Sequence, residues 1–138
     1  MKANTLINAG LLVVAPLIVW SLMSPLRGPR KAGRIALCKS EITALLAAAN
    51  KYEADYGSYP PGSAAEIIRS LLGNNPHKIA FLYLNTNRLK SDGIYLDPWG
   101  TPYQIHIEFE TNFIVRSAGI NKQFGDEDDE TSTSQKPF

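Results

Sequence analysis

Residues 97–117 read DPWGTPYQIHIEFETNFIVRS, and this stretch decides how the chain folds. Apolar and polar residues alternate through its middle, the apolar ones being Tyr103, Ile105, Ile107 and Phe109. This period of two predicts a strand that is buried on one face only, with His106 on the polar face. We expect a short turn at Thr111 and Asn112, and then a second, antiparallel strand over residues 113–117. The DPWG segment has proline second and glycine fourth, as a type I turn prefers.

Before this hairpin the sequence predicts a long helix. From Ile35 to Tyr56 the apolar residues follow each other in steps of three and four, which is typical of a helix with one buried face. Gly57 should end it. A shorter helix is expected from Ser63 to Leu72, because Glu66 follows Ser63 at the spacing of a capping box. Residues 74–96 predict one or two helical turns and a loop. The order predicts an α+β fold with the long helix packed on a small antiparallel sheet.

The N-terminal segment has a different composition. No charged residue lies between Lys2 and Arg27, and 16 of the 24 residues at positions 3–26 are hydrophobic. As a helix these residues would span about 36 Å, enough to cross a hydrocarbon core of about 30 Å, with a kink expected at Pro16. A cleaved secretory signal is the alternative, but no small-x-small site precedes the basic cluster that begins at Arg27. We expect residues 1–34 to be a membrane anchor with a basic flank and residues 35–138 a soluble domain with an acidic loop at residues 117–130.

Charge is also unevenly distributed. Residues 1–39 contain six Lys or Arg and no Asp or Glu, whereas residues 40–138 contain eight basic and 13 acidic residues. The basic cluster follows the apolar segment, so the positive-inside rule taken alone favours a cytoplasmic C-terminal domain. Lipid headgroups are natural counterions for such a cluster.

Five consecutive acids, residues 126–130, lie near the C-terminus. Runs of this kind are usually solvated tails. A hard-cation site is the other interpretation, because Asn121, Asp128 and Asp129 with backbone carbonyls could supply the oxygen ligands that Ca²⁺ takes. The spacing does not match an EF-hand loop. From the residues alone both interpretations stay open.

Four stretches together carry a family resemblance: the apolar N-terminus, KYEADYGSYP (51–60), DPWGTPYQI (97–105) and FIVRSAGINKQFGDEDD (113–129). In order and spacing they resemble the major, or G-type, pseudopilins of bacterial type II secretion systems, which belong to the type IV pilin class. The resemblance implies a membrane-embedded helix that continues into the soluble domain. It also implies calcium binding after the last strand, with Asn121, Asp128 and Asp129 as ligands and Ser117 and loop carbonyls as further candidates. The family more often has Asp at position 121.

The N-terminus departs from the family pattern. The family signature for cleavage and assembly reads Gly-Phe-Thr-Leu-Ile-Glu, and this chain has Ala3, Asn4 and Asn8 at the first, second and last of these positions. In the family the Glu is thought to pair with the N-terminal amine of a neighbouring subunit, and Asn8 cannot neutralise that charge. The departures favour a non-polymerising, membrane-anchored calcium-binding module, while the resemblance as a whole favours a pseudopilus subunit for protein export.

Other classes of function lack a motif. We find no glycine-rich phosphate loop, nucleophile elbow or paired-carboxylate motif, and His77 and His106 lack the spacing of a zinc site. We therefore expect neither an enzyme nor a protein that binds nucleic acid or a small-molecule substrate. The expected location is the bacterial inner membrane, single-pass, with the C-terminal domain in the periplasm. The expected partners are membrane lipid, further copies of this chain, other pseudopilins and secretion components.

Overall fold

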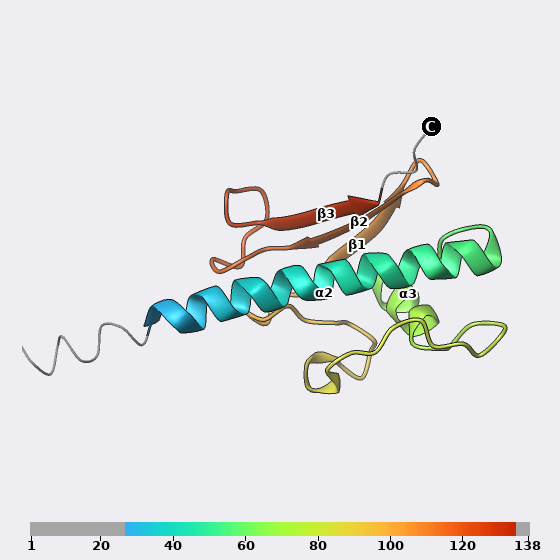
Figure 1. Cartoon of the computed structure of the whole chain (residues 1–138), viewed down its shortest axis with the longest axis horizontal. Coiled ribbons are helices and arrows are strands. Elements are labelled where there is room, and N and C mark those ends of the chain that lie inside the picture. The colour runs from blue at the N-terminus through green and yellow to red at the C-terminus, as the bar shows by residue number, and fades with distance from the viewer. Residues whose placement is uncertain (1–26, 135–138) are drawn as a thin grey trace, which may run out of the picture. The chain divides into compact units, whose positions relative to one another are not determined.

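The computed structural model describes residues 27–134 (Figure 1). Its helices are α2 (Arg27–Tyr56), α3 (Ala64–Leu71) and the short 3-10 helix η2 (Thr86–Arg88), and its strands are β1 (Gln104–Glu108), β2 (Asn112–Ser117) and β3 (Glu130–Ser134). The expected membrane helix and the signature positions lie outside the described residues. Of the helices within 27–134, none combines the length and apolar character needed to cross a membrane. Arg34–Phe138 forms one compact unit, which the following paragraphs describe.

Helix α2 confirms the predicted long helix, and its described part, Arg27–Tyr56, also includes residues before Ile35. The predicted domain boundary between residues 34 and 35 therefore lies inside a helix. The apolar stripe is buried as expected, with Cys38, Leu45 and Ala49 fully enclosed. At the C-terminal end the N–H of Gly57 donates to the carbonyl of Glu53 at 2.7 Å, and Gly57 has a φ of +80°. Glycine adopts this left-handed geometry without a Cβ penalty, so it ends the helix where the pattern predicted.

The sheet has three antiparallel strands in the order β1-β2-β3. The predicted hairpin is confirmed, with Ile105 opposite Val115. Strand β3 was not predicted, because its sequence ETSTS lacks apolar alternation and follows an acidic run. It pairs with β2 so that Ser117 lies opposite Glu130. The predicted acidic loop, residues 117–130, is therefore closed at its base by paired strands.

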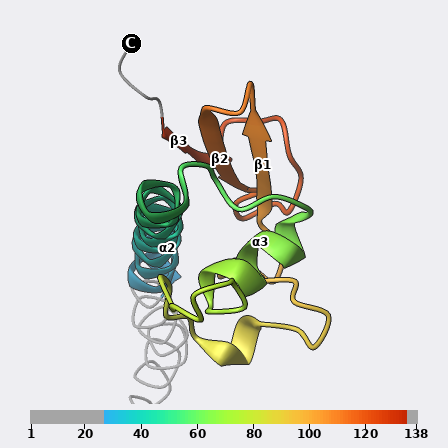
Figure 2. The same ribbon diagram turned by 90° about the vertical axis from the view of Figure 1, so that its right-hand side faces the viewer.

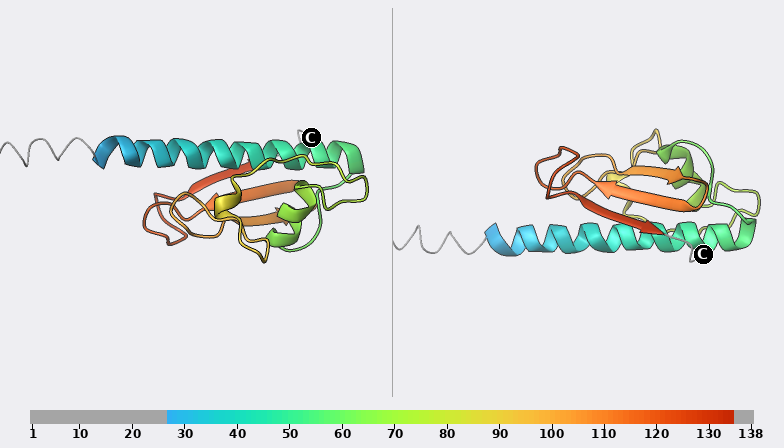
Figure 3. Two further views of the ribbon diagram at one scale, coloured as in Figure 1. Left: turned by 90° about the horizontal axis from the view of Figure 1, so that it is seen from below. Right: turned by 90° about the horizontal axis from the view of Figure 1, so that it is seen from above.

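The hydrophobic core lies between α2, the inner face of the sheet and α3. The sheet and α3 lie on the same side of α2 (Figure 2; Figure 3). Phe113 and Val115 of β2 are fully buried, and burying a side chain of this size stabilises the fold by about 1.5–3 kcal/mol. The Tyr59 and Phe113 rings meet at 5.4 Å, where the end of α2 reaches the sheet. The capping box of Ser63 and Glu66 begins α3 as predicted. The expected α+β arrangement is confirmed.

One residue of the predicted strand is placed differently. Phe109 was expected on the buried face, but β1 ends at Glu108 and the Phe109 side chain is 87% exposed. The turn is closed by the N–H of Thr111 donating to the carbonyl of Glu108 at 3.2 Å. Its two central residues, Phe109 and Glu110, have φ of +52° and +60°. The turn is thus centred two residues earlier than the sequence predicted.

Candidate functional site

Ser117 and Glu130, the ends of the predicted acidic loop, belong to β2 and β3, and residues 118–129 connect the two strands. The two limbs of this loop touch at Gly119. This glycine has a φ of +63°, and a Cβ placed on it would overlap the backbone carbonyl oxygen of Asp128. A side chain at position 119 would therefore meet both a strained backbone and a direct steric clash with main chain. The loop can close in this form only with glycine at this position.

Asn121 and Asp128 are brought together within the loop. Asp128 Oδ2 accepts hydrogen bonds from the backbone N–H groups of Ile120, at 2.8 Å, and Asn121, at 3.0 Å. The Asn121 side-chain amide donates to Asp126, and its Oδ1 accepts from the N–H of Gln123 at 2.7 Å. The pKa of Asp128 is lowered by its side-chain contact with Asp126 and by the N–H donors of Asn121 and Ile120. Two of the predicted ligands, Asn121 and Asp128, are therefore in contact within the loop.

Asp129 lies at the inner side of the loop. Its Oδ2 accepts from the N–H of Gly125 at 2.8 Å and from the Arg116 guanidinium at 3.2 Å. Its Oδ1 is buried and has no hydrogen-bond partner. The Nε atom of Arg116 is also buried without a partner. A buried carboxylate oxygen without a donor is costly. Asp129 therefore offers an unused oxygen of the kind that a hard cation takes, beside a guanidinium that already balances part of its charge.

Ser117 points elsewhere. Its side chain is fully buried, and its hydroxyl donates to Asp97 Oδ2 at 2.7 Å and accepts from the N–H of Gly119 at 3.2 Å. Within residues 27–134, no three His, Cys, Asp or Glu side chains are grouped so that they could hold a metal ion. The donor types of Asn121, Asp128 and Asp129, all oxygen, suit calcium, but a full ligand shell would also need loop carbonyls.

Asp97 connects the DPWG turn to the acidic loop. It is completely buried, and its Oδ1 accepts from the N–H groups of Trp99 and Thr101, both at 2.9 Å. Its own carbonyl accepts from the N–H of Gly100 at 3.0 Å, as the predicted turn requires. Its Oδ2 takes the Ser117 hydroxyl. From the sequence, Asp97 was expected only as a turn residue. The signal that could have indicated a larger role for this residue is an acid at the first position of a turn between two apolar segments.

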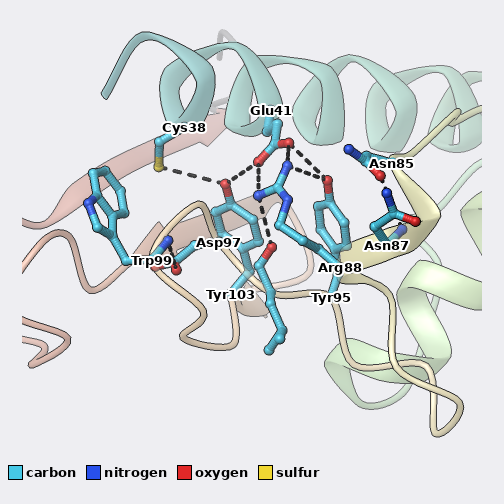
Figure 4. A network of polar contacts seen from close by, with 10 residues as sticks. Cys38, Glu41, Asn85, Asn87, Arg88, Tyr95, Asp97, Trp99 and Tyr103 are labelled. Carbon is cyan, nitrogen blue, oxygen red and sulfur yellow. Dashed lines mark hydrogen bonds and ion pairs between the residues drawn. The ribbon is translucent and has the colours of Figure 1, made fainter. Parts of the chain in front are cut away.

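A second polar network joins α2 to η2 and to the segment that follows η2 (Figure 4). Glu41 of α2 forms an ion pair with Arg88 and accepts hydrogen bonds from the hydroxyls of Tyr95, at 2.9 Å, and Tyr103, at 2.8 Å. Cys38 Sγ lies 3.6 Å from the Tyr103 hydroxyl. Burial, followed by the Cys38 and Glu41 contacts, raises the pKa of Tyr103, and burial also raises the pKa of the Cys38 thiol. This network fixes the long helix against the loop segment.

Glu41 and Arg88 were not singled out from the sequence. Glu41 lies one turn after Cys38 on the apolar side of a helix, and Arg88 lies in a stretch without periodicity. The signal that could have found Glu41 is a carboxylate next to a buried stripe, because such a group requires donors. Its donors come from residues about 50 positions later, and sequence spacing does not indicate them.

A long helix laid across a three-stranded antiparallel sheet, with a glycine-closed acidic loop between the last two strands, defines an α+β fold of the type IV pilin class. The family model for type II secretion system (T2SS), protein G, matches residues 27–136, and the chain belongs to this family. This confirms the G-type pseudopilin resemblance drawn from the sequence. The family match does not support the alternative of a non-polymerising calcium-binding module. No curated protein and no solved structure matches the chain.

Proposed function

We propose that this chain is a membrane-anchored pseudopilin that assembles with further copies and other pseudopilins into a pseudopilus for protein export. Membership of the protein G family carries the proposal. It is supported by α2, whose first described residue, Arg27, directly follows the apolar residues 3–26 in the sequence. The chain thus has the order of an anchor followed by a helix that enters the folded domain.

The test of assembly is the state of the full-length chain in membranes of a type II secreting bacterium. Sedimentation after mild detergent extraction should give particles of many copies, and the mature chain should begin at Asn4 by mass spectrometry. Ala3 and Asn8 replace the family's usual residues, so processing is the sharpest point of the test. A chain that keeps Met1 or Lys2 and sediments as a monomer would overturn the proposal.

For location we propose the inner membrane, with a single span and the C-terminal domain in the periplasm. The acidic loop suits a compartment in which calcium is plentiful, whereas the basic residues of positions 27–39 argue for the opposite orientation. A reporter enzyme that works only in the periplasm, fused after Phe138, should be active. Activity only of a matched cytoplasmic reporter at the same position would reverse the assignment.

We also propose that the acidic loop binds calcium through Asn121, Asp128, Asp129 and loop carbonyls. The Ser117 hydroxyl, the other candidate, would first have to leave its hydrogen bond with Asp97. Bound calcium would supply positive charge between Asp128 and Asp129, two adjacent acids that otherwise repel each other. The buried, unpartnered Asp129 Oδ1 supports a cation in this position. Asp129 to Asn should weaken binding more than Glu127 to Gln, because Glu127 is an exposed acid of the same run.

Chelation tests this proposal directly. The melting temperature of the full-length chain in detergent should fall when a calcium-specific chelator is added and recover with excess calcium. Asp129→Asn should reduce the difference, and Glu127→Gln should keep it. An identical melting temperature with and without chelator would rule out a calcium site that contributes to folding.

A further inference from the structure

The turn between β1 and β2 presents an unusual residue to solvent. Phe109 and Tyr83 are the most exposed large hydrophobic side chains of the described residues, at 87% and 88%. Phe109 also has a φ of +52°, a backbone region that bulky side chains rarely occupy. Asn and Gly adopt such turns far more readily. The turn therefore exposes an aromatic ring to solvent, and it does so in a backbone conformation that aromatic residues rarely adopt.

The surroundings of Phe109 give this tip a definite chemistry. Glu108 and Glu110 flank it, and both are exposed. Glu108 lies 3.3 Å from His106 on the outer face of β1, and Glu110 has a φ of +60°. The tip, residues 108–110, is thus an apolar anchor between two carboxylates. It is complementary to an exposed apolar side chain that has a cation beside it.

Helix α2 carries such a place on its own surface. Leu37 is 45% exposed, and Arg34 lies three residues before it on the same helix face. Lys39, two residues after Leu37, lies on another side of the helix, 3.6 Å from Glu130. Residues 1–39 contain no acid at all. The surface formed by Arg34 and Leu37, called here the basic helix surface, therefore pairs an exposed leucine with a cation.

The tip and the basic helix surface lie toward opposite ends of α2. Phe113, four residues after Phe109, packs on Tyr59 beyond the C-terminal end of the helix. The other end of β2 pairs with Glu130, which contacts Lys39. From Leu37 to the end of the helix is about 28 Å at 1.5 Å per residue. Figure 1 shows the turn between β1 and β2 near the C-terminal end of α2, so one molecule does not bring its own tip onto its basic helix surface.

We infer that the tip of residues 108–110 docks on the basic helix surface of a second copy of this chain. The inference rests on the proposed function, assembly of many copies, and specifies one contact in it. A contact between two different surfaces of the same chain is head-to-tail, and repeating it extends an open assembly. The area is small, so the contact depends on copies already held close together in the assembly. Neighbouring copies must be displaced along the helix axis relative to each other, because copies at the same depth would keep the tip and the surface about 28 Å apart.

Cysteine cross-linking of the full-length chain in isolated membranes tests the contact. The variant Leu37→Cys with Phe109→Cys, treated with a mild oxidant, should give a ladder of disulfide-linked multimers on a non-reducing gel. The native Cys38 is fully buried, and the wild-type chain shows its background. The matched control is Leu37→Cys with Tyr83→Cys, because Tyr83 is as exposed as Phe109. It should give at least fivefold less cross-linked product.

Charge reversal adds a second readout. Glu110→Lys in the cross-linking variant should reduce the ladder at least threefold, and Arg34→Glu added to it should restore part of the yield. Sedimentation separates the two hypotheses. If copies assemble but the ladder is missing, or if the Tyr83 control cross-links equally, the inference is wrong and the proposed function stands. If the chain sediments as a monomer and no pair cross-links, both are wrong.

Discussion

The Ser117 hydroxyl donates a 2.7 Å hydrogen bond to the Asp97 carboxylate inside the protein, and both side chains are completely buried. Asp97 opens the DPWG turn, and Ser117 ends β2 where the acidic loop begins. The N–H of Gly119 then donates to the same hydroxyl at 3.2 Å. Two of the four stretches that carry the family resemblance are therefore parts of one hydrogen-bonded unit.

Replacing Ser117 with Ala should destabilise the protein by about 1–3 kcal/mol, because Asp97 Oδ2 would stay buried without this donor. Urea unfolding should show a lower midpoint with an unchanged slope. Ser91→Ala is the matched control, because Ser91 is exposed in a loop. An equal midpoint for Ser117→Ala and wild type would mean that the hydrogen bond contributes nothing to stability.

Gly119→Ala should be more damaging than Gly125→Ala. Both glycines have positive φ, at +63° and +105°, so both substitutions strain the backbone by about 1–2 kcal/mol. Only at Gly119 would the new Cβ overlap the Asp128 carbonyl, whereas at Gly125 nothing lies within 4 Å. The difference between the two unfolding free energies therefore isolates the contact between the limbs of the loop. Equal losses would contradict this closed form of the loop.

Sequence periodicity predicted the parts of the fold that have local causes. The buried stripe from Cys38 to Tyr52 and the hairpin alternation from Tyr103 to Ile107 follow directly from the geometry of a helix and a strand. Strand β3 could not be found this way. Its edge position requires no apolar alternation, and its pairing with β2 depends on a partner 13 to 21 residues away in the chain.

The candidate site was predicted only in part. The Asn121 N–H donates to Asp128 because a short loop brings its own residues together, and the role of both residues as ligands stays a prediction. The Ser117 hydroxyl is taken by Asp97, a residue 20 positions earlier, and this contact depends on how the turn packs under the sheet. Phe109 was expected on the buried face because the apolar alternation continues past Glu108, the last paired residue of β1. The type of turn, and not hydropathy, decides where this strand ends.

Alkaline pH should weaken the protein through its buried tyrosines. Burial, together with hydrogen bonding to Glu41, raises the pKa of Tyr95 and Tyr103, whereas a phenol in the unfolded chain ionises at about pH 10. Below about pH 10 both states are neutral, so this contribution is complete. Above it, the unfolded state releases protons that the folded state keeps, and stability falls as pH rises toward the folded-state pKa.

Unfolding free energies at pH 8 and pH 11 measure this effect. Tyr103→Phe should lose stability at pH 8, because Glu41 loses a donor, but should fall less between the two pH values than wild type. Tyr83→Phe removes an exposed tyrosine and should fall as much as wild type. A Tyr103→Phe variant with the full wild-type decline would show that this buried phenol is not a source of alkaline sensitivity.

The coupling free energy between Glu41 and Arg88 should be larger than that between Lys39 and Glu130, a surface pair. Glu41 and Arg88 have side chains only 12% and 20% exposed, and the tyrosines of the network enclose them. Hydrogen bonds to charged groups in such places contribute about 1.5–3 kcal/mol, while exposed pairs contribute about 0–1 kcal/mol. The Lys39 side chain is 62% exposed, so its pair belongs to the second kind.

Double-mutant cycles with Glu41→Gln and Arg88→Met, and with Lys39→Met and Glu130→Gln, measure both couplings by urea unfolding. Strictly additive losses for Glu41 and Arg88 would mean that the two charges act independently, and that α2 is held against residues 86–103 by packing alone.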